Sequence, residues 1–525
     1  MMKTRRLKST ETNTKYSFKK DINDFIEFIK SNLNLALANI FFILLTYGIK
    51  LFQYSISIDT ECIIDDQNRL LQSWLTIDRY GLVLLKNIFG TVNFTPYVAT
   101  FLMLNTLFVL NMFLCFCFKY FYLGDIQDNV KCKIGLFVFS AVFITFPSLA
   151  EQFNFLLQGF EVAVAMLLSV ISAFLILKWS MSQYTKENIL YLLIGLIVLT
   201  ISFASYQSII FFFISVISSF LILFCLGNRE HDKDINLFKV SVKCLSMFLL
   251  ACILYLSSNA VVNIFYPKSK YLDGKVLWKV YSFEQCCNII FRYIKQVFLG
   301  DNIFFSKWFA LFTLIFVFIV ITTKFYKKTI LLISSFVLIL SPFMLSFVLA
   351  NIVDIRAQIM LPFVLAVECM VVLFSANRAI LKNSLMVLCI YISLNQSYTV
   401  NRLLYTEQMK YEEDVAIAND IAVRIGKLGL GEIPSNKPVV FLGVHYPKDN
   451  SNSLRGEVLG HSFWEWDGYD NYRKHGLMKV LGYSYMYPSD EQIAYAQELS
   501  TKMPEYPSEE CVAEFKNMII VKLSN

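Results

Sequence analysis

Two acidic side chains, Asp59 and Glu61, stand two residues apart directly after the first long apolar segment of the chain. A carboxylate at a membrane surface can act as a general base that removes the proton from a hydroxyl group while its oxygen attacks an electrophile. The pair could also supply oxygen ligands to a divalent cation. No third oxygen ligand is obvious, so a metal-independent role is favoured. The plainer interpretation is that either acid caps a helix or is solvated in a loop.

Further polar residues lie where other apolar segments meet water. Arg356, close to Asp354, could bind a phosphate with two parallel hydrogen bonds at the depth of a lipid headgroup. Pairing with Asp354 or snorkelling to the membrane surface is the alternative. Tyr206 and Gln207 lie in a short turn, where they could bind sugar hydroxyls or simply end a helix. Intramembrane and interfacial polar groups of this kind are candidate functional residues.

The composition shows what kind of scaffold must position these residues. The chain has 525 residues, of which 56% are hydrophobic and only 17% are charged. Soluble proteins carry about 25% charged residues, and no soluble fold could bury this much apolar surface. The sequence therefore predicts an all-α polytopic membrane protein.

A helix needs about 20 apolar residues to cross a bilayer. Eleven segments of 17–22 residues approach this length and predict about eleven transmembrane helices, and the last of them is short. The polar N-terminus followed by a span-length apolar segment indicates an uncleaved first span and no signal peptide. The predicted spans are 33–54, 97–118, 133–149, 160–177, 188–204, 208–226, 244–265, 307–323, 329–350, 357–375 and 379–395.

The distribution of lysine and arginine predicts the orientation of these spans. With the N-terminus in the cytoplasm, the inside segments hold 22 basic residues in about 86 positions. The outside loops hold only 10 in about 107 positions. Because the number of spans is odd, the C-terminal segment then lies outside, on the same side as the candidate site residues.

Three regions follow from this topology: a basic cytoplasmic tail (1–32), a transmembrane domain (33–395) with large outside loops near 55–96 and 266–306, and an outside domain (396–525). The last region carries a net charge of −5, and the rest carries +12. The basic residues therefore belong to the membrane part and do not indicate nucleic-acid binding. Buried strands near 438–444 and 518–523 and a helix at 490–499 predict a small α/β fold for the outside domain.

The segment 62–89 alternates apolar and polar residues with helical spacing, which is typical of amphipathic helices in a membrane interface. Its polar face includes Arg79 and Lys86. A helix packed on the spans of the protein itself would show the same pattern. Both arrangements leave Asp59 and Glu61 above the edge of the bilayer.

Taken together, these motifs resemble the glucosyltransferase II family, the polytopic O-antigen type-specific glucosyltransferases of bacterial serotype conversion. The resemblance covers nearly the whole chain after residue 35, and the order of the motifs makes it specific. The family pattern is Gly-Arg-Trp-Gly where this chain has Asp78-Arg79-Tyr80-Gly81, so the substrate pocket differs in detail. The matching segments are Tyr54–Glu61, Trp74–Leu85, Phe146–Phe155, Ser205–Ser208, Ser341–Arg356, Gly443, Leu477–Gly482, Met503-Pro504 and Val521–Ser524.

The resemblance implies a GT-C-type enzyme of the bacterial inner membrane. No cofactor is expected, apart from the divalent cation that Asp59 and Glu61 could hold. The implied donor is undecaprenyl-phosphate-glucose, and the implied acceptor is a sugar hydroxyl of the lipopolysaccharide O-antigen on the periplasmic side. Asp59 or Glu61 would be the base of an inverting reaction, and Arg356, with Arg79 and Lys86, would bind the donor phosphate. Membrane lipid, a glucosyl-lipid synthase and a flippase would be the functional partners. The remaining implied roles are sugar binding by Gln152, Tyr206 and Gln207, and an unspecified functional role for Lys522.

Two alternatives remain open at this point. A lipid-linked oligosaccharide flippase or other transporter would also be polytopic, although the sequence shows no inverted repeat. A GT-C transferase that uses a different sugar would carry the same catalytic groups. Neither the acceptor sugar nor the choice between Asp59 and Glu61 as base follows from the sequence.

Overall fold

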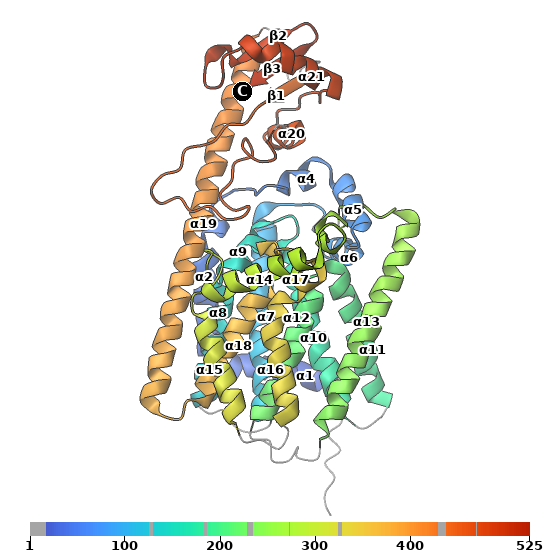
Figure 1. The fold of residues 1–525 in the computed structure, drawn as a ribbon, viewed down its shortest axis with the longest axis vertical. Helices are drawn as coiled ribbons and strands as arrows, with labels where there is room; N and C mark the ends of the chain where they lie inside the picture. The colour runs from blue at the N-terminus through green and yellow to red at the C-terminus, as the bar shows by residue number, and fades with distance from the viewer. Residues whose placement is uncertain are drawn as a thin grey trace, which may run out of the picture.

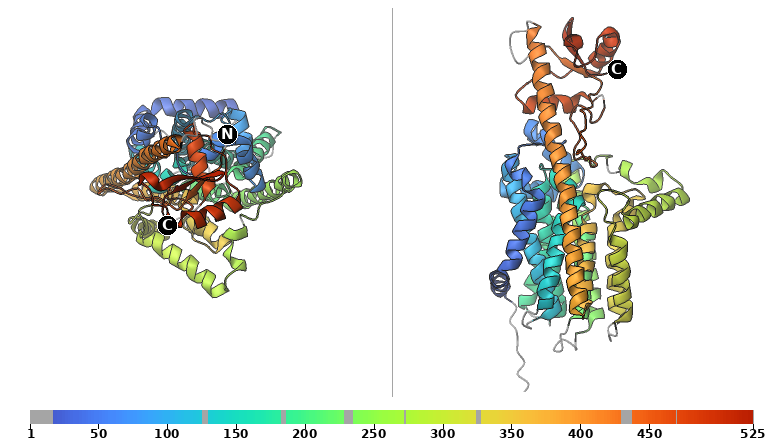
Figure 2. Two further views of the ribbon diagram at one scale, coloured as in Figure 1. Left: turned by 90° about the horizontal axis from the view of Figure 1, so that it is seen from above. Right: turned by 90° about the vertical axis from the view of Figure 1, so that its left-hand side faces the viewer.

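The computed structural model describes residues 17–124, 130–182, 186–227, 235–271, 273–323, 328–428, 437–468 and 470–524. These residues form a bundle of roughly parallel helices with a smaller domain above one end (Figure 1). Seen from above, the small domain lies over the bundle (Figure 2).

Within the described ranges, seven helical segments are long and apolar enough to cross a membrane. Two bent helix pairs raise this number to nine if each pair is one span: α1 with α2, at 79°, and α8 with α9, at 51°. The seven are α7 (Pro96–Leu123), α10 (Gly159–Met181), α11 (Lys186–Ser205), α12 (Ile209–Leu226), α13 (Leu237–Phe265), α16 with α17 (Lys328–Leu340 and Met344–Leu349) and α19 (Ala379–Lys427). The bent pairs are α1 (Phe18–Ser31) with α2 (Leu33–Tyr47), and α8 (Val130–Thr145) with α9 (Pro147–Asn154).

The other two predicted spans correspond to α15 (Phe309–Thr322) and α18 (Met360–Ser375), which are apolar but only 14 and 16 residues long. Both begin later than predicted, because turns take up residues 302–308 and the 3₁₀ turn Ile355–Ala357 precedes α18. The structure therefore supports a polytopic helical protein but does not establish eleven full-length spans.

Helices that are apolar on every face can form the core of the bundle, since such a helix must be surrounded by protein or lipid. Residues 360–374 of α18 are all buried, so this helix is central although it is short. By contrast, α13 has few buried residues and presents most of its apolar surface outward.

Short helices cover the end of the bundle next to the small domain (Figure 1). The predicted amphipathic segment 62–89 is divided among α4, α5 and α6. In α14, a capping box between Ser282 and Gln285 satisfies the first backbone N–H groups. These helices are α3 (Ile49–Phe52), α4 (Thr60–Asp65), α5 (Gln67–Thr76), α6 (Tyr80–Phe89) and α14 (Phe283–Leu299), and the 3₁₀ turns on this side are Asp273–Lys275, Leu277–Lys279, Ser341–Phe343 and Ile355–Ala357.

The small domain is joined to the bundle by α19, a single helix of 49 residues. The domain boundary expected between residues 395 and 396 falls inside this helix, so the helix belongs to both regions. The sheet of the small domain has the strand order β1-β3-β2, with β1 parallel and β2 antiparallel to β3. The elements are β1 (Val439–Leu442), α20 (Asn471–Val480), α21 (Asp490–Leu499), the 3₁₀ turns Ser500–Lys502 and Glu509–Cys511, β2 (Val512–Phe515) and β3 (Met518–Lys522).

One loop of the small domain is fixed to the bundle by buried carboxylates. Glu151 on α9, and Glu407 and Asp414 on α19, accept backbone N–H groups from residues 457–463 at 2.6–3.4 Å. These contacts give hydrogen-bond partners to backbone N–H groups of the loop. The loop is therefore held against the end of the bundle at three points.

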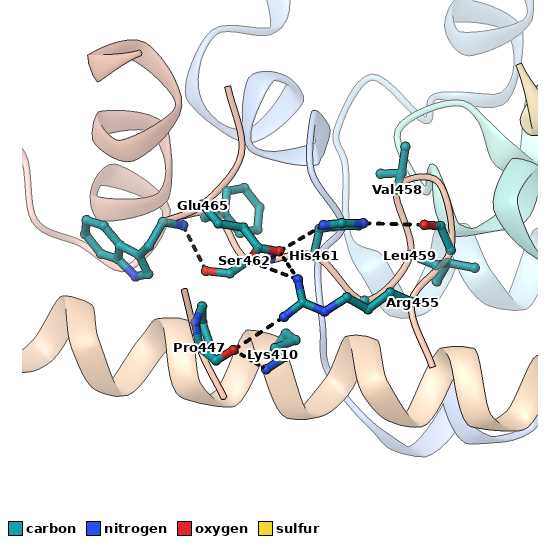
Figure 3. A network of polar contacts seen from close by, with 12 residues as sticks. Lys410, Pro447, Arg455, Val458, Leu459, His461, Ser462 and Glu465 are labelled. Atoms are coloured by element: carbon teal, nitrogen blue, oxygen red, sulfur yellow. Dashed lines mark hydrogen bonds and ion pairs between the residues drawn. The ribbon is translucent and has the colours of Figure 1, made fainter. Parts of the chain in front are cut away.

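A second polar network stiffens the same loop (Figure 3). Arg455 donates two hydrogen bonds to Glu465, at 2.7 and 2.9 Å, and His461 lies 2.9 Å from the same carboxylate. Burial by itself would raise the pKa of Glu465, but the hydrogen bonds from His461 and Arg455 lower this pKa to about 2. Lys410 on α19 donates to the Pro447 carbonyl at 3.0 Å, so the network is tied to the long helix.

Candidate active site

The two candidate bases lie at the start of α4, between the bundle and the small domain. The segment before them is buried, and the Ser57 hydroxyl donates to the Asn154 carbonyl at the end of α9 at 2.6 Å. Asp59 precedes α4 with a φ of 75°, a left-handed conformation that is uncommon for a non-glycine residue. Such conformations persist only where the surrounding structure enforces them, so the position of this carboxylate is well defined.

Arg473 on α20 connects these two carboxylates. Its guanidinium lies 2.7 Å from Glu61 and 3.0 Å from Asp59, and 2.7 Å from Asp467. Burial by itself would lower the pKa of Arg473, but Glu61 and Asp59 outweigh it and raise this pKa above its ordinary value. The cluster of one cation and three acids therefore keeps Arg473 charged and joins the small domain to α4.

The environments of the two acids differ. The Asp59 side chain is 41% exposed, whereas that of Glu61 is 1% exposed. Burial raises the pKa of Glu61 to about 7, against the opposing charge of Arg473. Gly476 on α20 lies so close to Glu61 that a Cβ atom there would come within 2.8 Å of its Cγ. Glu61 is thus enclosed, and Asp59 is the accessible carboxylate.

Arg79 lies on the other side of this region and makes no ion pair with any residue in the described ranges. Its Nε donates to Gln207 at 3.2 Å and an Nη donates to Gln158 at 3.4 Å. Gln207 is itself held by the Ile77 carbonyl at 2.8 Å, and the guanidinium lies 5.0 Å from the centre of the Tyr206 ring. Burial and then the nearby cation Arg356 lower the pKa of Arg79.

Arg356, in the 3₁₀ turn before α18, is the second cation of this group. Its guanidinium packs over the Phe155 ring at 4.7 Å, and among the described residues the one carboxylate it reaches is Asp354, at 3.9 Å. Asp354 is shared with Lys275, which is closer at 3.2 Å. Burial acts to lower the pKa of Arg356, but Tyr206, Asp354 and then Asp59 raise this pKa overall. Asp59 therefore lies within electrostatic reach of Arg356.

The small domain also contributes an acid to this group. Glu457, in the loop fixed by the buried carboxylates, accepts the backbone N–H of Ile355 at 2.7 Å. Burial raises the pKa of Glu457, and Arg356 is one of the charges that lower it. The loop therefore positions the turn that carries Arg356.

Gln152 lies on α9, which packs against the turn that carries Arg356. Its side chain is fully buried, and neither its amide nitrogen nor its amide oxygen has a hydrogen-bond partner among the described residues. An unpaired buried amide costs about 1–3 kcal/mol per group. Gln152 is therefore suited to a hydroxyl-bearing ligand.

Two sequence-predicted residues are engaged elsewhere. Lys86 is buried on α6 and forms an ion pair of 3.0 Å with Glu161, so its charge is already neutralised. Lys522 on β3 donates to the carbonyls of Ser500 and Met503 at 3.1 and 2.9 Å. Its contacts hold the sheet to the 3₁₀ turn Ser500–Lys502, which follows α21 within the small domain.

The position between Asp59 and Glu61 that a divalent cation would require is taken by the guanidinium of Arg473. No group of three or more His, Cys, Asp or Glu residues suited to a metal ion occurs in the part of the chain that the structure describes. A cation at this pair would have to displace the arginine.

Sequence reasoning missed Arg473 and Glu457. Arg473 lies 412 residues from Glu61 in the sequence, and Glu457 lies 102 residues from Ile355. Neither residue stands in a segment of distinctive composition. The nearest signal was the motif Leu477–Gly482, which begins on the same helix as Arg473. A contact between domains leaves no local periodicity, so only the folded chain reveals it.

A model of the glucosyl transferase GtrII family matches residues 48–373, which is more than half of the chain. The matched region contains Asp59, Arg79 and Arg356, and it ends before α19 and the small domain. No curated protein and no solved structure matches the chain significantly.

Proposed function

Because the chain belongs to the glucosyl transferase GtrII family, we propose that it transfers glucose from undecaprenyl-phosphate-glucose to a hydroxyl group of the lipopolysaccharide O-antigen. The reaction takes place on the periplasmic side of the bacterial inner membrane. Membership of the family indicates a glucosyltransferase. The lipid donor, the acceptor and the location are the proposal.

The observation that carries the proposal is an accessible carboxylate within electrostatic reach of Arg356, in a region where Arg356 and Arg79 lack a full set of counter-charges. Asp59 is exposed, Arg79 has no acidic partner in the described ranges, and Arg356 has only a distant one. An anion is needed to balance these arginines, and a guanidinium is well suited to a phosphate. A sugar phosphate bound there would bring its anomeric carbon towards the carboxylate.

Both acids pair with Arg473, but Asp59 is the base in this scheme because its side chain is 41% exposed, whereas that of Glu61 is enclosed. Asp59 takes the proton from the acceptor hydroxyl while that oxygen forms a bond to the anomeric carbon of glucose. The bond from this carbon to the phosphate oxygen breaks, and the phosphate leaves with the electron pair. Attack from the face opposite the leaving group inverts the anomeric configuration.

The arginines stabilise the charge that develops on the leaving phosphate. Gln207 orients Arg79 by accepting its Nε hydrogen. Sugar binding is assigned to Gln152 and Tyr206. No step in this scheme uses a metal ion. Glu61 and Arg473 act as positioning residues that hold Asp59 in its left-handed conformation.

The periplasmic orientation is supported by the excess of basic residues at the predicted inside ends of the helices. It also agrees with the chemistry, because nucleotide sugars are absent from the periplasm and a lipid phosphate is a suitable carrier there. Reporter fusions placed after residue 427 should be active only in the periplasm. A cytoplasmic signal would contradict the proposed location.

Mass spectrometry of lipopolysaccharide from cells with and without the gene tests the proposed function. We expect one added hexose per O-antigen repeat when the chain is present. Loss of the whole O-antigen on deletion would instead indicate a flippase or polymerase. A mass increment other than a hexose would indicate a transferase with a different donor.

A further inference from the structure

A cavity lies next to the carboxylate cluster, between α4 and α5 on one side and the small domain on the other. Its volume is about 560 Å³, within the range of roughly 300–1,000 Å³ that is common for small-molecule sites. It is lined by Asp65, Arg69, Asp470, Tyr472, His475, Lys479, Tyr485 and Tyr487.

The cavity and the carboxylate cluster share two structural elements. Helix α4 carries Glu61 at its start and Asp65 at its end, and α20 carries the neighbours Tyr472 and Arg473. The two helices pack directly against each other. A chain-like ligand whose end reached Asp59 could therefore extend into this cavity.

The charges in the cavity are balanced and partly paired, which argues against a charged ligand. Asp65 and Lys479 form an ion pair, and the guanidinium of Arg69 lies 4.7 Å above the ring of Tyr472. Asp470 caps α20 by accepting the backbone N–H of Tyr472 at 2.8 Å. Two acids thus face two bases, in contrast to the arginine pair of the active site.

The remaining lining is aromatic and hydroxylated. The Tyr487 ring is 48% exposed and contacts His475 at a ring distance of 5.1 Å. The Tyr485 hydroxyl is buried and has no hydrogen-bond partner in the described part of the chain. Burial lowers the pKa of His475, whose Nε2 lies 2.8 Å from the Val439 carbonyl oxygen. Aromatic faces pack against the C–H groups of a sugar ring, and balanced polar groups bind its hydroxyls.

We propose that this cavity binds the sugar residues of the acceptor glycan that flank the hydroxyl receiving glucose. This inference rests on the proposed function and adds a substrate subsite to it. A lipid chain would require an aliphatic lining, which the cavity lacks, and a phosphate would require an excess of cations, whereas Arg69 and Lys479 are balanced by Asp65 and Asp470. The small domain thereby takes part in acceptor selection as well as in positioning Asp59.

The test measures binding alone, without donor. O-polysaccharide is released by mild acid from the lipopolysaccharide of the bacterium that encodes the chain, and a fraction of several repeats is titrated calorimetrically into the detergent-solubilised full-length protein. We expect Tyr487→Ala to weaken binding roughly three- to tenfold, since one aromatic face is lost. Tyr485→Phe, which removes only the unpaired hydroxyl, should weaken it less.

The matched control is Tyr446→Ala, a change at a 68% exposed tyrosine of the same domain that does not line the cavity. It should bind the polysaccharide like the unchanged protein. Equal affinity of Tyr487→Ala and Tyr446→Ala, or absence of binding to any fraction, would overturn the inference. A protein that binds the polysaccharide through Tyr487 but transfers no hexose would contradict the proposed function and leave the subsite standing.

Discussion

The two halves of the candidate active site handle charge in opposite ways. In the carboxylate half, Asp59, Glu61 and Asp467 surround Arg473 at 2.7–3.0 Å, so this cation has all its counter-charges within the protein. In the arginine half, Arg79 has no acid within ion-pair distance among the described residues, and Arg356 has one at 3.9 Å. The first half is internally complete, and the second needs an anion from outside.

This difference separates positioning from binding. A buried group that has its partner within the fold defines geometry, because removing either partner leaves an unpaired charge. A cation without a partner is held ready for a ligand, at a cost that the ligand offsets when it binds. Asp59 is where the halves meet, since it contacts Arg473 and also acts on Arg356.

Asp59→Asn should have the largest effect on transfer, because it removes the base while keeping the side-chain shape. We expect the rate of glucose transfer to fall about 10²- to 10⁴-fold, the usual contribution of general base catalysis. The rate is measured in membranes that contain equal amounts of each variant. The control Asp66→Asn makes the same change at an exposed N-cap of α5, where Asn caps equally well, and should retain activity. Full activity of Asp59→Asn would remove this residue from the mechanism.

Arg79→Gln tests whether the unpaired arginines bind the donor phosphate. Loss of one charge-stabilising donor should reduce transfer about 10²-fold. Transfer by Arg79→Lys should be intermediate between that of the unchanged protein and that of Arg79→Gln, because lysine keeps the charge but loses the planar guanidinium. Arg292→Gln on α14, at an exposed position, serves as the control and should transfer normally. If Arg79→Gln and Arg292→Gln behaved alike, the contrast between the two halves would have no functional meaning.

Arg473→Met tests whether the carboxylate half holds the small domain to the bundle. It leaves Glu61 buried without its cation, a change that typically costs about 3–5 kcal/mol. The small domain should then become more sensitive to protease while the bundle stays intact. The double variant Arg473→Met with Glu61→Gln should recover much of the resistance, because it removes both charges. Unchanged protease resistance in the single variant would mean that this cluster does not hold the domain.

Glu61→Gln should have the smallest effect, seen in the pH dependence of stability. The pKa of Glu61 lies at about 7 in the folded chain, above its ordinary value of 4.5, so the folded state binds the proton more tightly. The resulting stabilisation is complete below about pH 4.5 and is lost as the pH rises through about 7. Thermal unfolding of the solubilised protein should therefore show a loss of about 1–3 kcal/mol between pH 5 and 8 that Glu61→Gln reduces. Parallel pH profiles for the two proteins would rule out this account of Glu61.

The scaffold was largely predictable because its signals are local. Apolar segments of span length correspond to the helices of the bundle, and the strands near 438–444 and 518–523 pair in parallel as β1 and β3. The number of full-length spans is harder to predict, because hydropathy does not show where a turn such as Ile355–Ala357 shortens a helix. The boundary at 395–396 was placed where composition changes, but the backbone of α19 continues through it.

The site was only partly predictable. Asp59, Glu61, Arg79 and Arg356 lie at helix ends facing the same side of the bundle, so the predicted topology was sufficient to group them. The positions of Arg473 and Glu457 depend on how the small domain is seated, and no local pattern encodes that. The catalytic and binding roles assigned to these residues stay predictions.

The most direct test of the central claim is glucose transfer by the purified chain in liposomes that contain undecaprenyl-phosphate-[¹⁴C]glucose and O-antigen acceptor. We predict that label enters the glycan with the unchanged protein and with Asp66→Asn, and that Asp59→Asn and Arg79→Gln transfer little. Transfer from a nucleotide-linked glucose but not from the lipid phosphate, or undiminished transfer by Asp59→Asn, would contradict the account.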